Sequence, residues 1–451
     1  MPDADEPRRS RKGWLSALAP LREPGLALLL AFLGGALVIW VTSGSLGVVG
    51  AAYGGLVSGA FLKTRGLSET LVATTPYIFL SLALAVGFAA GLFNIGLEGQ
   101  FIVGAVCAAW SGGWFSTAPA ILHLPLALGA GAAGGALWAM IPAYLKAKTG
   151  AHEVINLIMM NFIAFRLTEY FVRGPLRDTH SSTVQTARVS PNAEMWSLNQ
   201  IPERLSDPLN AAAAAIACAL LAWAIAARLR ARHARTSSGT TLRLRPLTLS
   251  AACVVVGLTV FFELGPLARA WWPFNDPYDR LHVGIFLALV AAALVSWLLR
   301  RTPFGMDIRT VGANPDAAKY AGIDVARSYL SAMAISGALA GVAGTIEVLG
   351  VSTCRCLPLF FSSGYGFESV AITLLAHNNP LGIVAGSFLF GAMRNGADFM
   401  ELHSGVSKDV ISLIQGLVLL FVAAPALVRR LLRMKTGPVP IADQRDGGGG
   451  L

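Results

Sequence analysis

Apolar stretches of about 20 residues recur along almost the whole chain, separated by short polar or glycine-rich segments. A helix of that length crosses roughly 30 Å, the thickness of the hydrocarbon core of a membrane. The pattern therefore predicts an all-α, polytopic integral membrane protein with about 10–12 transmembrane helices. The predicted spans are residues 26–42, 70–91, 99–116, 119–143, 153–172, 209–228, 247–265, 282–299, 326–349, 367–377, 381–396 and 409–428.

Two segments depart from a simple series of spans. Residues 367–377 are too few to cross a membrane alone, which predicts a short re-entrant or broken helix. Residues 45–66 are glycine-rich and only moderately apolar, so a loop with a short surface helix is the expectation there.

The remaining chain organises as one transmembrane domain, residues 26–430, between two tails. The basic tail, residues 1–25, precedes a full-length span rather than the short apolar core of a signal peptide, so we expect it to be cytoplasmic. The tail at residues 431–451 is polar and rich in Pro and Gly, which predicts disorder.

Composition supports a membrane protein and gives its orientation. Hydrophobic residues make up 55% of the chain and charged residues 13%, against roughly 25% charged in soluble domains. The net charge of +10 does not indicate nucleic-acid binding, because the basic residues lie between spans. With both termini cytoplasmic, the predicted cytoplasmic segments hold 23 of the 35 Lys and Arg residues, as the positive-inside rule requires. A multi-pass protein of the bacterial cytoplasmic membrane is expected.

Motifs for catalysis or metal binding are missing from the sequence. There is no phosphate-binding G-x-x-x-x-G-K-[ST], no H-E-x-x-H and no G-x-S-x-G, so we predict neither an enzyme nor a metal site. Cys354 and Cys356 lie in a connecting segment, where a disulfide is possible only if the segment faces an oxidising compartment.

Residues 91–100 interrupt apolar sequence with Asn94, Glu98 and Gln100. Ionisable groups inside a membrane are costly and tend to face a cavity or a partner. Glycines among them would allow a broken helix whose free backbone groups line a pathway. An ordinary cytoplasmic turn between two spans explains the segment equally well.

Residues 300–327 predict a compact helix–turn unit between two spans. Asn314 can cap a short helix with Pro315 at its first position, and a second turn follows at Gly322. A segment with its own capped helix favours a docking element over a solvated tether.

Residues 364–382 begin with Gly364, Gly366 and Glu368 and end in an Asn–Asn–Pro turn, which favours a re-entrant element. Asn156 and Asn161 lie inside another span, where hydrogen bonds between helices are the simplest explanation.

Four segments together resemble one family: GLFNIGLEGQFIVGA (91–105), HEVINLIMMNFIA (152–164), RTVGANPDAAKYAGI (309–323) and GYGFESVAITLLAHNNPLG (364–382). The family is the bacterial ABC-importer permeases of the branched-chain amino acid, ribose and nucleoside group. The nucleoside or simple-sugar branch is the most similar, and the resemblance covers most of residues 25–430.

The resemblance implies a translocation pathway and a cytoplasmic coupling segment within that fold. The implied pathway residues are Phe93, Asn94, Glu98, Gln100, Asn156, Asn161, Gly364, Gly366, Phe367 and Glu368. The implied ATPase-coupling residues are Gly312, Asn314, Pro315, Asp316, Lys319, Tyr320 and Gly322. The sequence departs from the family at residues 209–265, where an extra helical hairpin of unassigned role is predicted.

The resulting hypothesis is a permease subunit of an ATP-driven importer, first for nucleosides, with simple sugars or branched-chain amino acids as alternatives. Its implied partners are a cytoplasmic ABC ATPase, a second permease subunit, an extracytoplasmic solute-binding lipoprotein and membrane lipid. The chain would bind no cofactor, because ATP is used by the partner. An ion-coupled secondary transporter is the alternative from another class, and it would need a relay among Glu98, Glu347 and Asp398.

Overall fold

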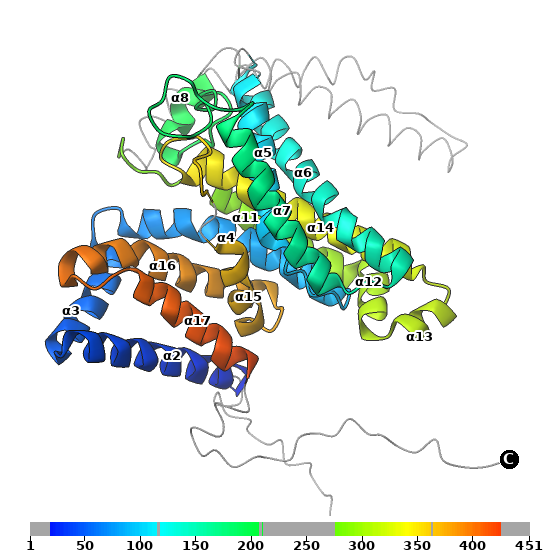
Figure 1. Ribbon diagram of the computed structural model, residues 1–451, viewed down its shortest axis with the longest axis horizontal. Coiled ribbons are helices and arrows are strands. Elements are labelled where there is room, and N and C mark those ends of the chain that lie inside the picture. Colours follow the sequence, from blue (N-terminus) through cyan, green and yellow to red (C-terminus); the bar gives the residue numbers. More distant parts are fainter. Residues whose placement is uncertain (1–18, 115–117, 207–209, 211–275, 362–363, 425–451) are drawn as a thin grey trace, which may run out of the picture.

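The computed structural model describes residues 19–114, 118–206, 210, 276–361 and 364–424 (Figure 1). The predicted hairpin at 209–265, apart from residue 210, lies outside the described residues, as do residues 1–18 and the tail at 431–451. The α-helices are α2 (Ala19–Ser43), α3 (Leu46–Val57), α4 (Gly66–Ala89), α5 (Leu97–Trp114), α6 (Ala120–Thr149), α7 (Glu153–Arg173), α8 (Ile201–Ser206), α11 (Gly284–Arg301), α12 (Pro303–Ala313), α13 (Pro315–Tyr320), α14 (Val325–Ile346), α15 (Tyr365–Leu375), α16 (Pro380–Ser404) and α17 (Asp409–Ala423). Shorter π- and 3-10-helical segments are η1 (Ser58–Leu62), η2 (Leu198–Gln200) and η3 (Glu347–Val351).

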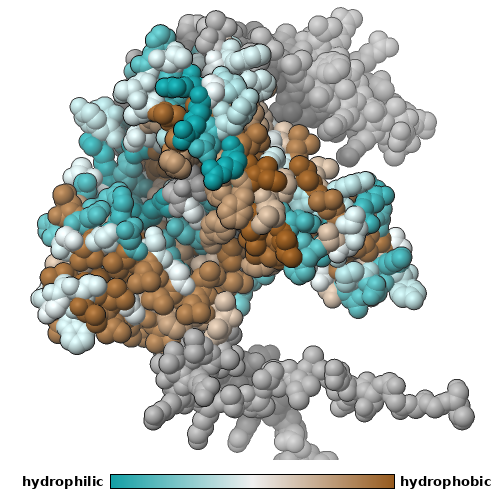
Figure 2. All heavy atoms as spheres, in the orientation of Figure 1, coloured by the Kyte–Doolittle hydropathy of each residue, from teal (hydrophilic) through white to brown (hydrophobic). Residues whose placement is uncertain are grey.

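The prediction of an all-α polytopic membrane protein is confirmed. Within the described residues six helices are long and apolar enough to cross a membrane, namely Pro24–Ser43, Gly66–Ala89, Ala120–Thr149, Glu153–Arg173, Gly284–Arg301 and Val325–Val351. Apolar side chains gather on the surface over the α2 and α17 region (Figure 2). That surface suits contact with lipid or with another apolar protein face.

Residues 45–66 are helical nearly throughout, not the loop with a short helix that their composition predicts. They form α3 and η1, which lie against α16. A Cβ atom added at Gly59 would come within 2.5 Å of the Cβ of Phe399. Gly55 and Gly59 therefore serve close packing against α16, since small residues let helix backbones approach each other within a membrane. α16 is also longer than predicted and ends at Ser404 rather than residue 396.

The molecule has two distinct ends. At one end, α12 and α13 project from the helix bundle; at the opposite end lies α8 with the segment that precedes it (Figure 1). Arg280 ties elements together at the α8 end, because it donates to a carboxylate oxygen of Glu69 at 3.3 Å and also to the carbonyl of Val351. The start of α4 and the end of η3 therefore meet there. In the same region the Arg65 guanidinium lowers the pKa of the Asp276 carboxyl.

The centre of the bundle is a close contact of α5, α6 and α14 through glycines. A Cβ atom at Gly135 of α6 would overlap the carbonyl oxygen of Gly337 in α14, and one at Gly104 of α5 would overlap the backbone of Gly341. Where hydrophobic driving force between helices is absent, such backbone proximity supplies the dispersion contacts that hold helices together.

We expect Gly135→Ala to destabilise the bundle by about 1–3 kcal/mol, the usual cost of overpacking, since its methyl group has no space against α14. Gly129→Ala, six positions earlier on the same helix, is the matched control, because nothing lies within 4 Å of a Cβ atom there. Thermal unfolding in detergent, followed by size-exclusion chromatography, measures both. Equal melting temperatures for the two variants would contradict the glycine contact.

Candidate functional site

A break in the helical backbone separates α4 from α5, because α4 ends at Ala89 and α5 begins only at Leu97. Asn94 lies fully buried in this break and organises it. Its Oδ1 accepts the N–H of Gly96 at 3.1 Å, and its amide exchanges hydrogen bonds of 2.9 and 3.0 Å with the amide of Gln100. Its Nδ2 also donates to the hydroxyl of Ser336 in α14 at 2.8 Å. Buried side chains thus supply the hydrogen bonds of this segment, which is a broken helix and not a solvated turn.

Asn161 of α7 completes the start of α5. Its Oδ1 accepts the N–H of Gly99 at 2.8 Å, and its Nδ2 donates to the carbonyl of Ile95 at 3.0 Å. These are backbone groups that a helix start leaves without partners of its own. Asn156, one and a half turns earlier, does not join them, and its Nδ2 has no hydrogen-bond partner among the described residues.

Glu98 joins the start of α5 to the start of α15. Its side chain is fully buried, and its Oε2 accepts the N–H of Gly366 at 2.6 Å. Gly364 enters α15 with φ of +84°, a left-handed conformation that favours glycine. A Cβ atom at Gly366 would lie 2.6 Å from both the backbone nitrogen and the carboxylate of Glu98, so only glycine fits. A carboxylate placed between two helix N-termini is stabilised by the positive end of each helix dipole.

Glu368 lies in the first turn of α15, where three further side chains surround it. Tyr77 of α4 donates to its Oε2, and Arg394 of α16 forms an ion pair with it at 3.5 Å. Arg394 also donates to the Tyr77 hydroxyl at 3.2 Å, and its Cζ lies 4.0 Å from the ring centroid of Tyr365. A guanidinium paired with a carboxylate and an aromatic face is well compensated for burial.

We call this assembly the α5–α15 junction: Asn94, Glu98, Gln100, Asn161, Gly366 and Glu368, with Tyr77, Tyr365 and Arg394. The first six were predicted as pathway residues from the sequence. The last three were not, and the signal for Arg394 is a lone arginine within an otherwise apolar helix. Of the other predicted residues, Phe93 stacks on Phe88 at 5.4 Å, and Phe367 is 47% exposed.

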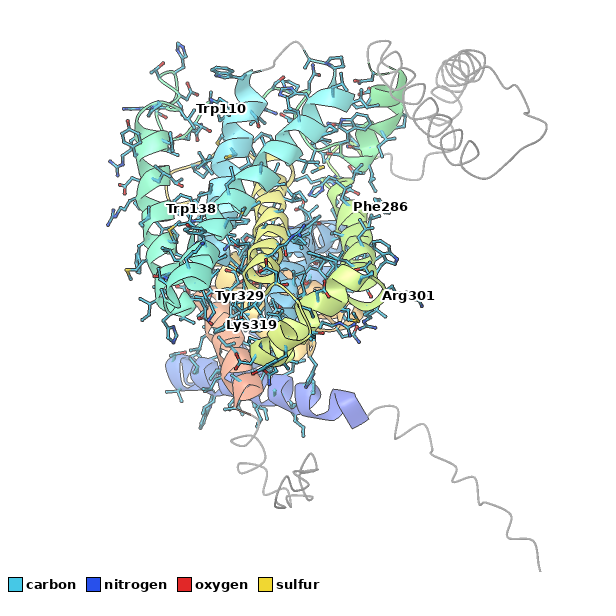
Figure 3. The ribbon with its side chains drawn as sticks, turned by 90° about the vertical axis from the view of Figure 1, so that its right-hand side faces the viewer. Trp110, Trp138, Phe286, Arg301, Lys319 and Tyr329 are labelled. Carbon is cyan, nitrogen blue, oxygen red and sulfur yellow. A yellow bond between two sulfur atoms is a disulfide. The ribbon has the colours of Figure 1, made fainter. Side chains whose placement is uncertain are left out.

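The capped helix predicted within residues 300–327 is present. Asn314 accepts the N–H groups of Asp316 and Ala317, each at 3.0 Å, and Pro315 occupies the first helical position of α13. Tyr320 is 94% exposed, and Gly322 ends the unit with φ of +82°. Figure 3 shows Lys319 of this unit near one end of the molecule and Trp110 of α5 near the other.

Gly312 connects this projecting unit to the helix break. A Cβ atom there would overlap the carbonyl oxygen of Ala89, the last residue of α4. On the other side of the contact, a Cβ atom at Gly91 would lie 3.0 Å from the Gly312 carbonyl oxygen. Backbone therefore touches backbone three residues before Asn94, so a displacement of α12 and α13 bears directly on the break.

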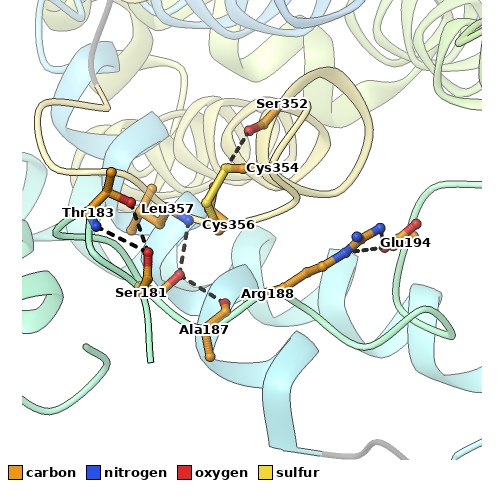
Figure 4. The surroundings of a disulfide bond; sticks show 10 residues. Ser181, Thr183, Ala187, Arg188, Glu194, Ser352, Cys354, Cys356 and Leu357 are labelled. Carbon is orange, nitrogen blue, oxygen red and sulfur yellow. Dashed lines mark hydrogen bonds and ion pairs between the residues drawn. A yellow bond between two sulfur atoms is a disulfide. The ribbon is translucent and has the colours of Figure 1, made fainter. Parts of the chain in front are cut away.

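A disulfide joins Cys354 to Cys356 at the α8 end (Figure 4). The same segment is held by Thr186, whose hydroxyl accepts the N–H of Leu357 at 2.9 Å, and by Val189, whose N–H donates to the carbonyl of Arg355 at 2.9 Å. Burial lowers the pKa of the Arg355 guanidinium, and its pairing with Glu194 opposes that shift. Within the described part of the chain no group of His, Cys, Asp and Glu side chains could hold a metal ion.

Comparison with known proteins gives consistent matches over most of the chain. Residues 66–423 match the family model described as branched-chain amino acid transport system / permease component. A guanosine ABC transporter permease protein of Bacillus subtilis is 32% identical, over 91% of this chain and 95% of that protein. A glucose ABC transporter permease protein of Haloferax volcanii is 28% identical, over 94% and 92% respectively. A nucleoside ABC transporter permease protein of Lactococcus lactis subsp. cremoris is 26% identical, over 91% and 92%. No solved structure gives a significant match.

We expect Asn161→Ala to destabilise the protein by about 1–3 kcal/mol for each polar group left buried without a partner, here the Gly99 N–H and the Ile95 carbonyl. Asn156→Ala on the same helix is the matched control, since its Nδ2 makes no hydrogen bond to lose. Melting temperatures in detergent should fall clearly for the first variant and little for the second. The reverse order would show that Asn161 does not hold the start of α5.

Proposed function

Because this chain belongs to the family of branched-chain amino acid transport system permease components, we propose that it forms the nucleoside pathway of an ATP-binding-cassette importer. As a family member it is a multi-pass permease component of such a transporter and not its ATPase. The observation that carries the choice of solute is the nearly full-length similarity to a guanosine permease.

The chemistry of the α5–α15 junction suits a nucleoside. Aromatic rings gather there, with the Phe101 and Tyr365 centroids 5.7 Å apart and the Tyr77 and Tyr365 centroids 4.8 Å apart. Such rings favour a flat heterocyclic base, while carboxylates and amides accept hydrogen bonds from ribose hydroxyls. Simple sugars are the second candidate, because the glucose permease relative aligns over a similar length.

The pathway in this proposal passes the helix break and the junction. The residues that line or brace it are Phe93, Asn94, Glu98, Gln100, Asn156, Asn161, Gly364, Gly366, Phe367 and Glu368. Broken helices in transporters place backbone dipoles at the solute route, because irregular backbone is tolerated within a membrane only where protein or a cavity satisfies it. The buried hydrogen bonds of Asn94 and Asn161 support this role.

Energy for transport comes from a partner ATPase in this proposal, so the chain itself binds no cofactor. Coupling to the ATPase is assigned to Gly312, Asn314, Pro315, Asp316, Lys319, Tyr320 and Gly322, since α13 projects from the bundle with an exposed surface. A second permease subunit completes the pore, and an extracytoplasmic lipoprotein delivers the solute at the α8 end. Both termini then lie in the cytoplasm of a bacterial cell, in keeping with the distribution of basic residues.

An ion-coupled transporter is less well supported. Asp398 has a side chain that is 78% exposed and pairs with Lys408 at 3.4 Å, whereas Glu98 is fully buried. A proton or sodium relay needs carboxylates in sequence along one route, and this arrangement separates two of the three candidates.

The solute proposal predicts saturable uptake of labelled guanosine or uridine by cells that express the chain with its ATPase and binding lipoprotein. Uptake should stop when the ATPase carries an inactivating substitution, and should persist when proton and sodium gradients are collapsed. Accumulation of glucose or leucine but not nucleosides would overturn the solute class. Uptake without a functional ATPase would overturn the importer.

The coupling proposal predicts different defects for two sites in the same unit. Tyr320→Ala should reduce co-purification of the ATPase without changing the melting temperature, because the side chain is 94% exposed. Gly312→Val should retain the ATPase yet lose uptake by about tenfold or more, because its contact with Ala89 transmits the motion. Replacing residues 312–320 with a Gly/Ser linker should abolish both. Unaltered ATPase association and uptake in the linker variant would contradict the coupling role.

A further inference from the structure

Four pairs of segments repeat along the chain in the same order. Each pair occupies matching helices, α4 with α14, α5 with α15, α6 with α16 and α7 with α17. The pairs are SLALA (81–85) with SGALA (336–340), GLEG (96–99) with GFES (366–369), PLALGAGA (125–132) with PLGIVAGS (380–387), and EVINLIM (153–159) with DVISLIQ (409–415). The last pair begins at the first residue of α7 and of α17. The common order of these matches indicates that the two halves derive from one four-helix unit.

The two copies run in opposite directions. Arg280 contacts both Glu69, near the start of α4, and Val351, beyond the end of α14, so these counterpart helices are antiparallel. Asn395, in the second half of α16, donates to the carbonyl of Gly66 at the start of α4 at 2.9 Å. The repeat is thus inverted, the arrangement that in other transporters places the solute site between the copies.

The first helix of each copy packs within the other copy. α14 lies against α5 and α6, while α4 lies against α15 and α16. Serines in matching places take part in these contacts. The Ser336 hydroxyl accepts from the Asn94 amide at 2.8 Å, and the backbone carbonyl of Ser81 accepts from the Thr373 hydroxyl at 3.1 Å. Neither copy can close its core alone, so the copies must rearrange together.

Glu98 and Glu368 occupy the same place in the repeated segment but make different contacts. Glu98 accepts the N–H of Gly366, whose counterpart is Gly96. Gly96 donates instead to the Asn94 side chain, and Glu368 is held by Tyr77 and Arg394. The register that pairs residues 125–132 with 380–387 sets Ala139 opposite Arg394, so the ion pair has no equivalent in the first copy.

We propose that the two carboxylates exchange roles during transport: in the opposite state of the pathway Glu368 accepts the N–H of Gly96, and Glu98 releases Gly366. This inference rests on the proposed transport function, and it adds a gate to the proposed pathway. Two inverted copies of one sequence can each adopt the conformation of the other, which converts one opening of a pathway into the opposite one. Arg394 pairs with Glu368 while that carboxylate makes no contact with Gly96, and so favours the conformation described here.

The proposal makes opposite predictions for single and double substitutions. Glu98→Gln weakens the contact that holds this conformation, because a neutral amide oxygen is a poorer acceptor of the Gly366 N–H than a carboxylate. Arg394→Gln leaves Glu368 without its cation, so each substitution should shift the population away from this conformation. Glu368→Gln combined with Arg394→Gln removes the ion pair as a unit and also the carboxylate needed for the opposite conformation. The double variant should therefore shift the population back, past the wild type.

A reporter cysteine at Phe367, which is 47% exposed, measures the population in the full chain with its ATPase, in a background where Cys107, Cys218 and Cys253 are replaced by Ala. A membrane-impermeant maleimide is applied to right-side-out and to inside-out vesicles. The ratio of the two labelling rates should change by about tenfold in one direction for Glu98→Gln and Arg394→Gln, and in the other for the double variant. Glu401→Gln, at the exposed end of α16, is the control and should leave the ratio unchanged.

A shift of all three variants in the same direction, or no shift, would overturn the exchange. Variants that fail to give a single peak in size-exclusion chromatography are replaced by Glu98→Asp and by Glu368→Asp with Arg394→Gln, which should give smaller shifts of the same opposite signs. The ratio is independent of the solute, so opposite shifts together with failed nucleoside uptake would refute the proposed solute and leave the exchange standing. Normal nucleoside uptake, together with shifts of all three variants in the same direction, would support the proposed solute and refute the exchange.

Discussion

Backbone N–H groups at the starts of α5 and α15 impose the constraint on which the rest of the structure depends. Both helices begin at positions buried inside the protein, where no water reaches these groups to accept from them. The protein supplies the acceptors itself: Asn94 for Gly96, Asn161 for Gly99 and Glu98 for Gly366. Each acceptor comes from a different element, so satisfying the two helix starts also fixes how α5, α7, α14 and α15 lie against one another.

Glycine makes these contacts geometrically possible. Gly366 admits the Glu98 carboxylate, Gly312 admits the end of α4, and the glycines of α6 and α14 allow backbones to touch. A sequence rich in glycine would be flexible in water, but within a membrane the same residues give close and specific helix packing. The projecting α12–α13 unit consequently touches the helix break through backbone at Gly312, and side chains of Asn94 and Glu98 join the break and the start of α5 to α14 and α15.

Repetition explains why so many polar residues occur in matched places. In the inferred inverted repeat, a Gly–x–Glu segment stands at the start of both α5 and α15. The copies differ in side chains. Gly364 stands in the second copy where the first has Asn94, and Ala139 stands in the first copy where the second has Arg394. Because the two copies share a fold but differ in their side chains, two conformations of the protein can have similar but unequal free energies.

The sequence by itself determined the all-α membrane architecture, the capped helix at Asn314 and the permease family, because apolar length, capping residues and local motifs are properties of neighbouring positions. It left residues 91–100 open between a broken helix and an ordinary turn. It misjudged residues 45–66, where glycine signals packing rather than a loop. Only the tertiary structure decided which polar groups meet. Glu98 and Gly366 are 268 positions apart, and Tyr77 and Arg394 are 317 apart. No local spacing encodes such pairs, since they arise only when helices from both copies pack and each buried charge or N–H must find a partner.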